Sequence, residues 1–270
     1  LNKMATAGDL APALLSQALA APLQLNPLPQ PPAPAPHFLR EIAGRLPGAA
    51  PRLVRTHLDP GLQTRLNSLV ATTCRQRRKQ GLRQAAALVI RNRDRAVLAW
   101  VGSPDWHDPA GGQVDGVTAP RSPGSALKPF LYALALESGR TLADVLADEP
   151  MTLPVAGGAF RPVDYDGQAR GPVRLRIALA SSLNLPALRL VREITPAAFL
   201  MRLRALGFAL PKSAEHYGLA LTLGDGEVSL LELTTAYAAL AAGGAYQPPL
   251  LWQGQRRAAT RPVVSAAAAR

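Results

Sequence analysis

The fold is decided by one stretch, Gly124-Ser125-Ala126-Leu127-Lys128-Pro129-Phe130, which is typical of the first turns of an apolar helix. Apolar residues continue at helical spacing towards Gly139. Pro129 is tolerated, because the first four N–H groups of a helix have no partner within it. If the helix begins at Ser125, Lys128 lies one turn later on the same face. The stretch therefore predicts a serine and a lysine side by side at a helix N-terminus.

This pair has a chemical interpretation. A serine hydroxyl becomes nucleophilic when a base removes its proton, and a lysine amine can be that base if burial lowers its pKa. The N–H groups of a helix N-terminus can bind a developing oxyanion. The chain has 26 Arg but only four Lys, and arginine stays protonated. The lysine at position 128 therefore favours a role as a catalytic base. An ordinary helix start also accounts for the four-residue pattern.

A second polar element, Ser182-Leu183-Asn184, begins 57 residues after Ser125 and lies between two helical patterns. A serine and an asparagine on a tight turn can point into one cleft. The hydroxyl can relay a proton there, and the amide can hold a substrate carbonyl. Alternatively, Asn184 caps a helix that starts at Pro186. The residues alone leave both interpretations open.

The N-terminal part of the chain is predicted to be mainly helical. Hydrophobic spacing predicts a helix over 9–25, and six of the ten residues in 27–36 are Pro, which is typical of a stiff extended linker. Asp59-Pro60 is a good helix start, and an apolar stripe that includes Leu69 continues from it towards Arg78.

The rest of the chain combines a hairpin with a block of helices. Two apolar runs, 85–90 and 96–101, flank a polar turn and predict two antiparallel strands. A short helix is expected from Thr141, where Asp144 completes a capping pair, and 150–172 is expected to be irregular. Longer helices are predicted over 173–181, 186–194, 196–206 and 229–242. The fold class is therefore α+β.

Composition excludes several classes of function. The formal net charge is +12, but aromatic residues make up only 5% and do not alternate with the basic ones, so we expect a solvated basic surface and no nucleic-acid partner. Cys74 and the four scattered His residues lack the spacing of a catalytic pair or a metal site. Asp164-Tyr165-Asp166-Gly167 lacks most ligands of a calcium loop, and a turn is the better interpretation. No apolar run is long enough to span a bilayer.

The order of the two polar motifs resembles that of the penicillin-recognising serine enzymes, which use Ser-x-x-Lys, then Ser-x-Asn, then Lys-Thr/Ser-Gly. Over about residues 37–270 the chain is similar to class A (bifunctional) penicillin-binding proteins, especially those of the 1C type. The segments that carry the resemblance are Thr56–Gln63, Val101–Ser103, Pro120–Phe130, Tyr165–Gly167, Leu179–Ala187, Leu223–Val228 and Leu233–Tyr237.

The resemblance implies the transpeptidase fold of penicillin-binding proteins and β-lactamases, in which a helical block packs with an antiparallel sheet. It implies that Ser125 is the nucleophile, Lys128 the general base, Ser182 a proton relay and Asn184 the amide that positions the substrate. No cofactor or metal is implied. The expected partners are peptidoglycan stem peptides ending in D-Ala-D-Ala, and β-lactams, which acylate the same serine. The expected location is the periplasmic side of the bacterial inner membrane, and the oligomeric state stays open.

The same resemblance predicts a domain organisation. Residues 1–36 are expected to be the tail of a preceding region and a Pro-rich linker, 37–84 a linker helix region, and 85–270 a transpeptidase domain that is incomplete at its C-terminus. The family's membrane anchor and glycosyltransferase domain are expected before residue 1. The Lys-Thr/Ser-Gly motif is not found, because Lys212-Ser213-Ala214 comes too early in the chain.

Two other functions stay open from the sequence. A serine β-lactamase shares the nucleophile but needs a deacylating carboxylate, which nothing in the sequence marks. An inactive binding or scaffolding fragment is the other alternative, because the third motif and its strand are missing. For the same reason we expect weak or absent acylation of this chain by penicillin, and marginal solubility from an exposed sheet edge.

Overall fold

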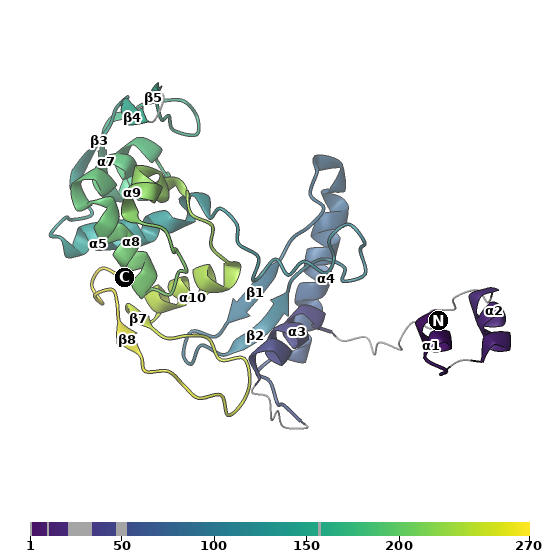
Figure 1. The fold of residues 1–270 in the computed structure, drawn as a ribbon. Helices are drawn as coiled ribbons and strands as arrows, with labels where there is room; N and C mark the ends of the chain where they lie inside the picture. The colour runs from purple at the N-terminus through teal and green to yellow at the C-terminus, as the bar shows by residue number, and fades with distance from the viewer. Residues whose placement is uncertain (1, 10, 21–33, 47–52, 156–157) are drawn as a thin grey trace. The chain divides into compact units, whose positions relative to one another are not determined.

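The computed structural model describes residues 2–9, 11–20, 34–46, 53–155 and 158–270 (Figure 1). The chain divides into two compact units, residues 1–33 and residues 34–270.

The first unit contains α1 (Asn2–Thr6) and α2 (Pro12–Ala20). The helix predicted over 9–25 begins at Pro12 instead of residue 9, in keeping with the preference of proline for the first helical position. Residues 10 and 21–25 of that prediction lie outside the described residues, as does most of the predicted Pro-rich linker.

The second unit opens with two helices. Sequence patterns do not predict α3 (Pro36–Arg45), which starts at the last proline of the expected linker and buries Phe38 and Ile42. The predicted helix after Asp59 is confirmed as α4 (Pro60–Gln76), and the Asp59 side chain accepts a hydrogen bond from the N–H of Leu62 at 2.8 Å. A short 3-10 helix, η1 (Arg78–Gln80), follows α4.

The predicted hairpin is confirmed as two antiparallel strands, β1 (Ala87–Ile90) and β2 (Val97–Val101). Leu88 lies opposite Trp100 in the pairing. The Trp100 ring is buried and packs against Phe38 with ring centroids 5.6 Å apart. A small apolar core therefore joins α3 to the hairpin.

Hydrogen bonds also join β2 to α4. The buried Gln63 side chain accepts from the Trp100 N–H at 2.8 Å and donates to the Trp100 carbonyl at 2.9 Å. The Asp59 N–H donates to the Leu98 carbonyl at 2.9 Å. The predicted apolar stripe is wrong at Leu69, which is 62% exposed, because the face of α4 towards β2 contributes the Gln63 amide instead.

A block of helices carries the larger core, in which α5 (Lys128–Glu137) packs against α7 (Asn184–Ile194) and α8 (Pro196–Ala205) (Figure 1). Phe130, Leu131 and Ala135 of α5 are completely buried. The predicted helices over 173–181, 186–194, 196–206 and 229–242 are confirmed, with shifted ends. The elements of the block are η2 (Gly124–Leu127), α5 (Lys128–Glu137), α6 (Leu175–Ala180), α7 (Asn184–Ile194), α8 (Pro196–Ala205), α9 (Ala214–Tyr217), η3 (Gly218–Leu223) and α10 (Leu230–Ala241).

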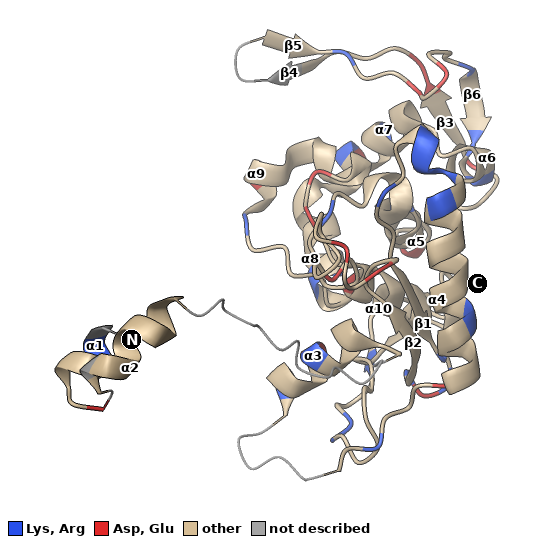
Figure 2. Cartoon of the chain, turned by 90° about the vertical axis from the view of Figure 1, so that its right-hand side faces the viewer, with Lys and Arg blue, Asp and Glu red and all other residues tan. Residues whose placement is uncertain are grey.

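Three further antiparallel pairs correct the sequence predictions. The helix expected from Thr141 is wrong: a turn stands there, because the residues that follow form a strand. The segment 150–172, expected to be irregular, contains a hairpin that stands out from the helical block in Figure 2. The pairs are β3 (Val145–Asp148) with β6 (Gly171–Arg174), β4 (Leu153–Val155) with β5 (Gly158–Phe160), and β7 (Ala245–Tyr246) with β8 (Arg261–Pro262). The predicted α+β class is confirmed.

Candidate active site

Ser125 lies in the 3-10 turn η2, and Lys128 is the first residue of α5. The Lys128 N–H donates to the Ser125 carbonyl oxygen, so the two residues are one turn apart, as the sequence predicts. The regular α-helix starts at Lys128 rather than at Ser125. Ser125 is exposed, and Pro129 in the first helical turn removes no intrahelical hydrogen bond. The serine is therefore presented to solvent at a helix N-terminus.

The segment that leads to Ser125 is held by residues about a hundred positions later in the chain. Arg121 forms an antiparallel bridge with Val228, and both of its N···O distances are 2.9 Å. Ser122 Oγ donates to the Gly224 carbonyl at 2.9 Å. These contacts fix the approach of the chain to the serine.

The turn itself packs closely against η3 and α10. Gly224 lies so near Gly124 that a Cβ at position 224 would be 2.3 Å from the Gly124 nitrogen. The Tyr237 hydroxyl of α10 donates to the Ala126 carbonyl at 3.0 Å, and its ring packs edge-on against Phe130. The position of the serine thus depends on a glycine and a tyrosine outside its own motif.

Lys128 is buried, with 1% of its surface exposed, and its amine contacts the turn 182–184. Nζ donates to the Ser182 carbonyl at 2.6 Å, the Leu183 carbonyl at 3.1 Å and Asn184 Oδ1 at 2.8 Å, and lies 3.4 Å from Ser182 Oγ. Burial lowers the pKa of Lys128 to about 8, and the Asp164 carboxylate partly opposes this effect.

The turn from α6 to α7 adopts a constrained backbone. Ser182 has a φ of +54°, a left-handed conformation that is uncommon outside glycine and often marks functional sites. The alternative in which Asn184 caps a helix from Pro186 is wrong, because α7 begins at Asn184 itself. Leu183 at the N-cap offers no side-chain acceptor. The Asp164 carboxylate accepts the hydrogen bond from the Asn184 N–H instead.

The structure thus brings Lys128, Ser182 and Asn184 into direct contact. Ser125 lies one turn before Lys128, but within the described part of the chain no hydrogen bond joins its hydroxyl to the lysine amine.

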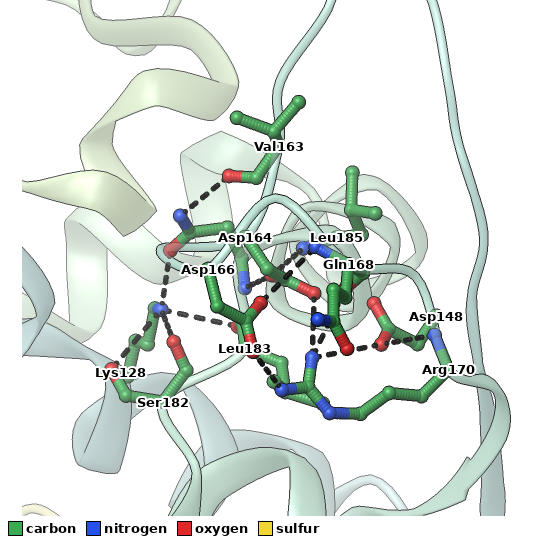
Figure 3. A network of polar contacts seen from close by, with 11 residues as sticks. Lys128, Asp148, Val163, Asp164, Asp166, Gln168, Arg170, Ser182, Leu183 and Leu185 are labelled. Atoms are coloured by element: carbon green, nitrogen blue, oxygen red, sulfur yellow. Dashed lines mark hydrogen bonds and ion pairs between the residues drawn. The ribbon is translucent and has the colours of Figure 1, made fainter.

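Sequence reasoning missed a group of acidic residues behind this turn, drawn in Figure 3. Asp148 and Asp164 are buried, and Arg170 Nη1 lies 3.7 Å from an Asp148 oxygen and 3.6 Å from an Asp164 oxygen. Arg170 also pairs with Asp166. The predicted turn is present, since the Gly167 N–H donates to the Asp164 carbonyl at 2.9 Å. The Asp-rich sequence 164–167 could have indicated this acidic group. Its other member, Asp148, lies in β3, a strand that local sequence patterns do not predict.

Two further properties of the described residues bear on function. No group of three or more His, Cys, Asp or Glu side chains among them is arranged to hold a metal ion. Among the same residues, no helix combines the length and the apolar character needed to cross a bilayer.

Comparison with known families and sequences gives a consistent result. The family described as "Penicillin binding protein transpeptidase domain" matches residues 85–270. Penicillin-binding protein 1C of Escherichia coli (strain K12) is 36% identical over 248 residues, which are 90% of this chain and 31% of that protein. Penicillin-binding protein 1A of Neisseria gonorrhoeae is 34% identical over 172 residues, covering 62% of this chain and 21% of that protein. The chain therefore spans less than a third of the length of these relatives.

Solved structures show the same likeness. Penicillin-binding protein 1A from Haemophilus influenzae aligns with a TM-score of 0.55 and 29% identity, over 63% of this chain and 25% of that one. Penicillin-binding protein A from M. tuberculosis, in an imipenem acyl-enzyme complex, aligns with a TM-score of 0.67 and 22% identity, over 86% and 65%. At that level of identity the second match concerns the fold alone.

Proposed function

Because this chain belongs to the penicillin-binding protein transpeptidase family, we propose that it is a serine-type DD-transpeptidase domain that cross-links peptidoglycan. The observation that carries the proposal is the Lys128 amine. It is buried, hydrogen bonded to Asn184, close to Ser182 and one turn from an exposed Ser125. A buried amine of lowered pKa next to a serine is the arrangement that acyl transfer through a serine needs.

In the first half-reaction, Ser125 Oγ attacks the carbonyl carbon of the penultimate D-Ala of a stem peptide. The hydroxyl proton passes to Lys128, which must be neutral to accept it. A pKa of about 8 leaves about a tenth of the amine neutral at pH 7. The C–N bond then breaks, and the terminal D-Ala leaves after taking a proton from Lys128 through Ser182 Oγ, which lies 3.4 Å from the amine.

The negative charge on the carbonyl oxygen needs hydrogen-bond donors. We assign one to the Ser125 backbone N–H in η2, one turn before α5, where the helix dipole favours negative charge. The Asn184 amide carries two N–H groups. One donates to the Val163 carbonyl at 2.9 Å, and we assign the other to a substrate carbonyl.

The second half-reaction transfers the acyl group from Ser125 to an amine of a neighbouring stem peptide, which restores the hydroxyl. A β-lactam enters the same path, but its ring opens on Ser125 and the product stays attached. We place this chemistry on the periplasmic side of the bacterial inner membrane, where the peptidoglycan substrate is found. We propose the stem-peptide substrates for the transpeptidase domain that this chain shares with the longer penicillin-binding proteins named above.

The test is covalent labelling of the purified chain with a fluorescent penicillin, followed by intact mass spectrometry. We expect a slow, stable adduct that is absent from Ser125→Ala and retained by Ser181→Ala, a change at a neighbouring exposed serine. Lys128→Arg keeps the positive charge but cannot act as a base, so labelling should slow by at least about 100-fold. Label in both the unsubstituted chain and Ser125→Ala, or in neither, would contradict Ser125 as the nucleophile.

The same experiment separates the two rival functions. Release of hydrolysed penicillin with repeated turnover would identify a serine β-lactamase. A folded chain that binds penicillin without forming a covalent bond would identify an inactive binding module. Neither rival is favoured by a contact at the site.

A further inference from the structure

The turn that carries Ser182 and Asn184 is held from outside by residues 163–164. Asp164 Oδ1 accepts hydrogen bonds from the N–H groups of Asn184 and Leu185, the latter at 3.3 Å. The Val163 carbonyl accepts from the Asn184 side-chain amide at 2.9 Å. Both the backbone and the side chain of Asn184 are therefore fixed by one loop, and Asp164 serves as the N-cap that α7 lacks in its own sequence.

Asp164 in turn has a carboxylate neighbour. Asp148 and Asp164 are 0% and 3% exposed, and their side chains are close enough to share a hydrogen bond. Asp148 Oδ1 and Asp164 Oδ2 are both buried and accept no hydrogen bond from the described groups, although Asp164 Oδ2 lies 3.6 Å from Arg170 Nη1. A proton on one acid supplies the donor that these oxygens lack. Burial, together with the hydrogen bond to Asp164, raises the pKa of Asp148, which favours the protonated form of this acid.

The surrounding charges agree with this assignment. From α5, Tyr132 faces both acids and Lys128 faces Asp164. Arg170, just before β6, lies near both acids and also pairs with the exposed Asp166. Tyr132 stays neutral, because burial and the nearby Asp164 raise its pKa. With Asp148 protonated, the cations Lys128 and Arg170 are matched by the carboxylates of Asp164 and Asp166. A second ionised acid would leave an uncompensated charge in the interior, which is costly.

We propose that Asp164 is the positioning residue of this site: its carboxylate, hydrogen bonded to Asp148 and paired with Arg170, fixes Ser182 and Asn184 around Lys128. The role in catalysis rests on the proposed acyl transfer at Ser125. Asp164 acts in two separable ways. Its oxygen caps α7 and sets the geometry of the turn, and its charge favours the protonated form of Lys128.

Two substitutions separate these contributions. Asp164→Asn keeps an oxygen that can cap α7 but removes the charge, whereas Asp164→Ala removes both. Asp166→Asn is the matched control, because it removes a carboxylate from the same loop and from the same arginine. Asp166 is exposed and is not among the charges that act on Lys128.

The first measurement is an NMR titration of the chain labelled with ¹³C and ¹⁵N at lysine, which is practical because there are only four lysines. Lys128→Arg assigns the signal. We expect a midpoint for Lys128 near pH 8, lowered by roughly half a unit or more in Asp164→Asn, because an opposite charge is lost. The midpoint should not move in Asp166→Asn. No movement in Asp164→Asn, or equal movement in both variants, would overturn the proposal.

The second measurement is the rate of labelling by fluorescent penicillin at saturating pH, beside the thermal unfolding midpoint. The labelling rate of Asp164→Ala should fall by roughly 10-fold to 100-fold. The rate of Asp164→Asn should stay much closer to that of the unsubstituted chain. Equal losses in the two variants that follow their unfolding midpoints would show a merely structural role. Absence of an adduct in the unsubstituted chain would count against the proposed function, and the lysine titration would still decide the role of Asp164.

Discussion

Gly224 offers a sharp test of how the nucleophile turn is held. Its φ is +96°, and a Cβ added there would lie 2.3 Å from the Gly124 nitrogen and 2.4 Å from the Gly124 Cα. Ordinary contact begins at 3.4 Å, so Gly224→Ala must push the two backbones apart by about 1 Å. The left-handed backbone costs roughly 1–2 kcal/mol for alanine, and overpacking adds about 1–3 kcal/mol. We expect Gly224→Ala to lose about 2–5 kcal/mol of unfolding free energy.

Gly139 is a matched control, because it has the same φ of +96° with nothing within 4 Å of an added Cβ. Gly139→Ala should therefore lose only the backbone contribution of roughly 1–2 kcal/mol. Urea unfolding measures both losses. The rate of penicillin labelling provides the second comparison, since displacement of a reacting group by about 1 Å can slow a reaction about 100-fold. Labelling should fall in Gly224→Ala and stay unchanged, per folded molecule, in Gly139→Ala.

Two results would refute this reasoning. Equal losses of unfolding free energy in the two variants would mean that the contact with Gly124 relaxes without cost. Unchanged labelling in a destabilised Gly224→Ala would mean that the turn carrying Ser125 does not depend on η3.

Two further predictions concern the base and the hairpin. The rate of acylation should rise with pH through a midpoint near 8, because burial lowers the pKa of Lys128 to about 8 and only the neutral amine accepts the serine proton; initial rates from pH 6 to 10 measure this, and a flat profile would contradict it. Gln63→Leu should lose about 1–3 kcal/mol of unfolding free energy, because the Trp100 N–H and carbonyl lose their partners in the interior. Gln80→Leu, at an exposed glutamine, should change the urea midpoint little, and a similar loss there would count against the role of Gln63.

Structure that depends on neighbouring residues could be predicted from this sequence. Asp59 caps α4 through the N–H group three positions later. The helix predicted over 229–242 starts at a reciprocal pair of hydrogen bonds between Ser229 and Glu232, which are three positions apart. The hairpin was also predictable, because its two apolar runs are separated only by a short polar turn. In each case the partners lie within one turn of helix or one hairpin.

Predictions failed where the deciding partner is distant in the chain. Thr141 does donate to Asp144, as in a capping pair, but the residues after it pair with β6 and form a strand. Asn184 was a reasonable cap on its own, yet Asp164, twenty positions earlier, takes that role. Neither of the two short motifs indicates by itself that Lys128 contacts the turn 182–184. That contact could be expected only because the two motifs together resemble those of a known family.

The hydrogen bonds between α4 and the hairpin have a directional consequence. Along β2, Asp59 occupies the Leu98 carbonyl, and Gln63 occupies both the N–H and the carbonyl of Trp100, so a further strand on that side would have to displace the start of α4. Within the described residues, β1 has no second neighbouring strand. Growth of this sheet, whether from the same polypeptide or from another molecule, is therefore one-sided, and it proceeds from β1.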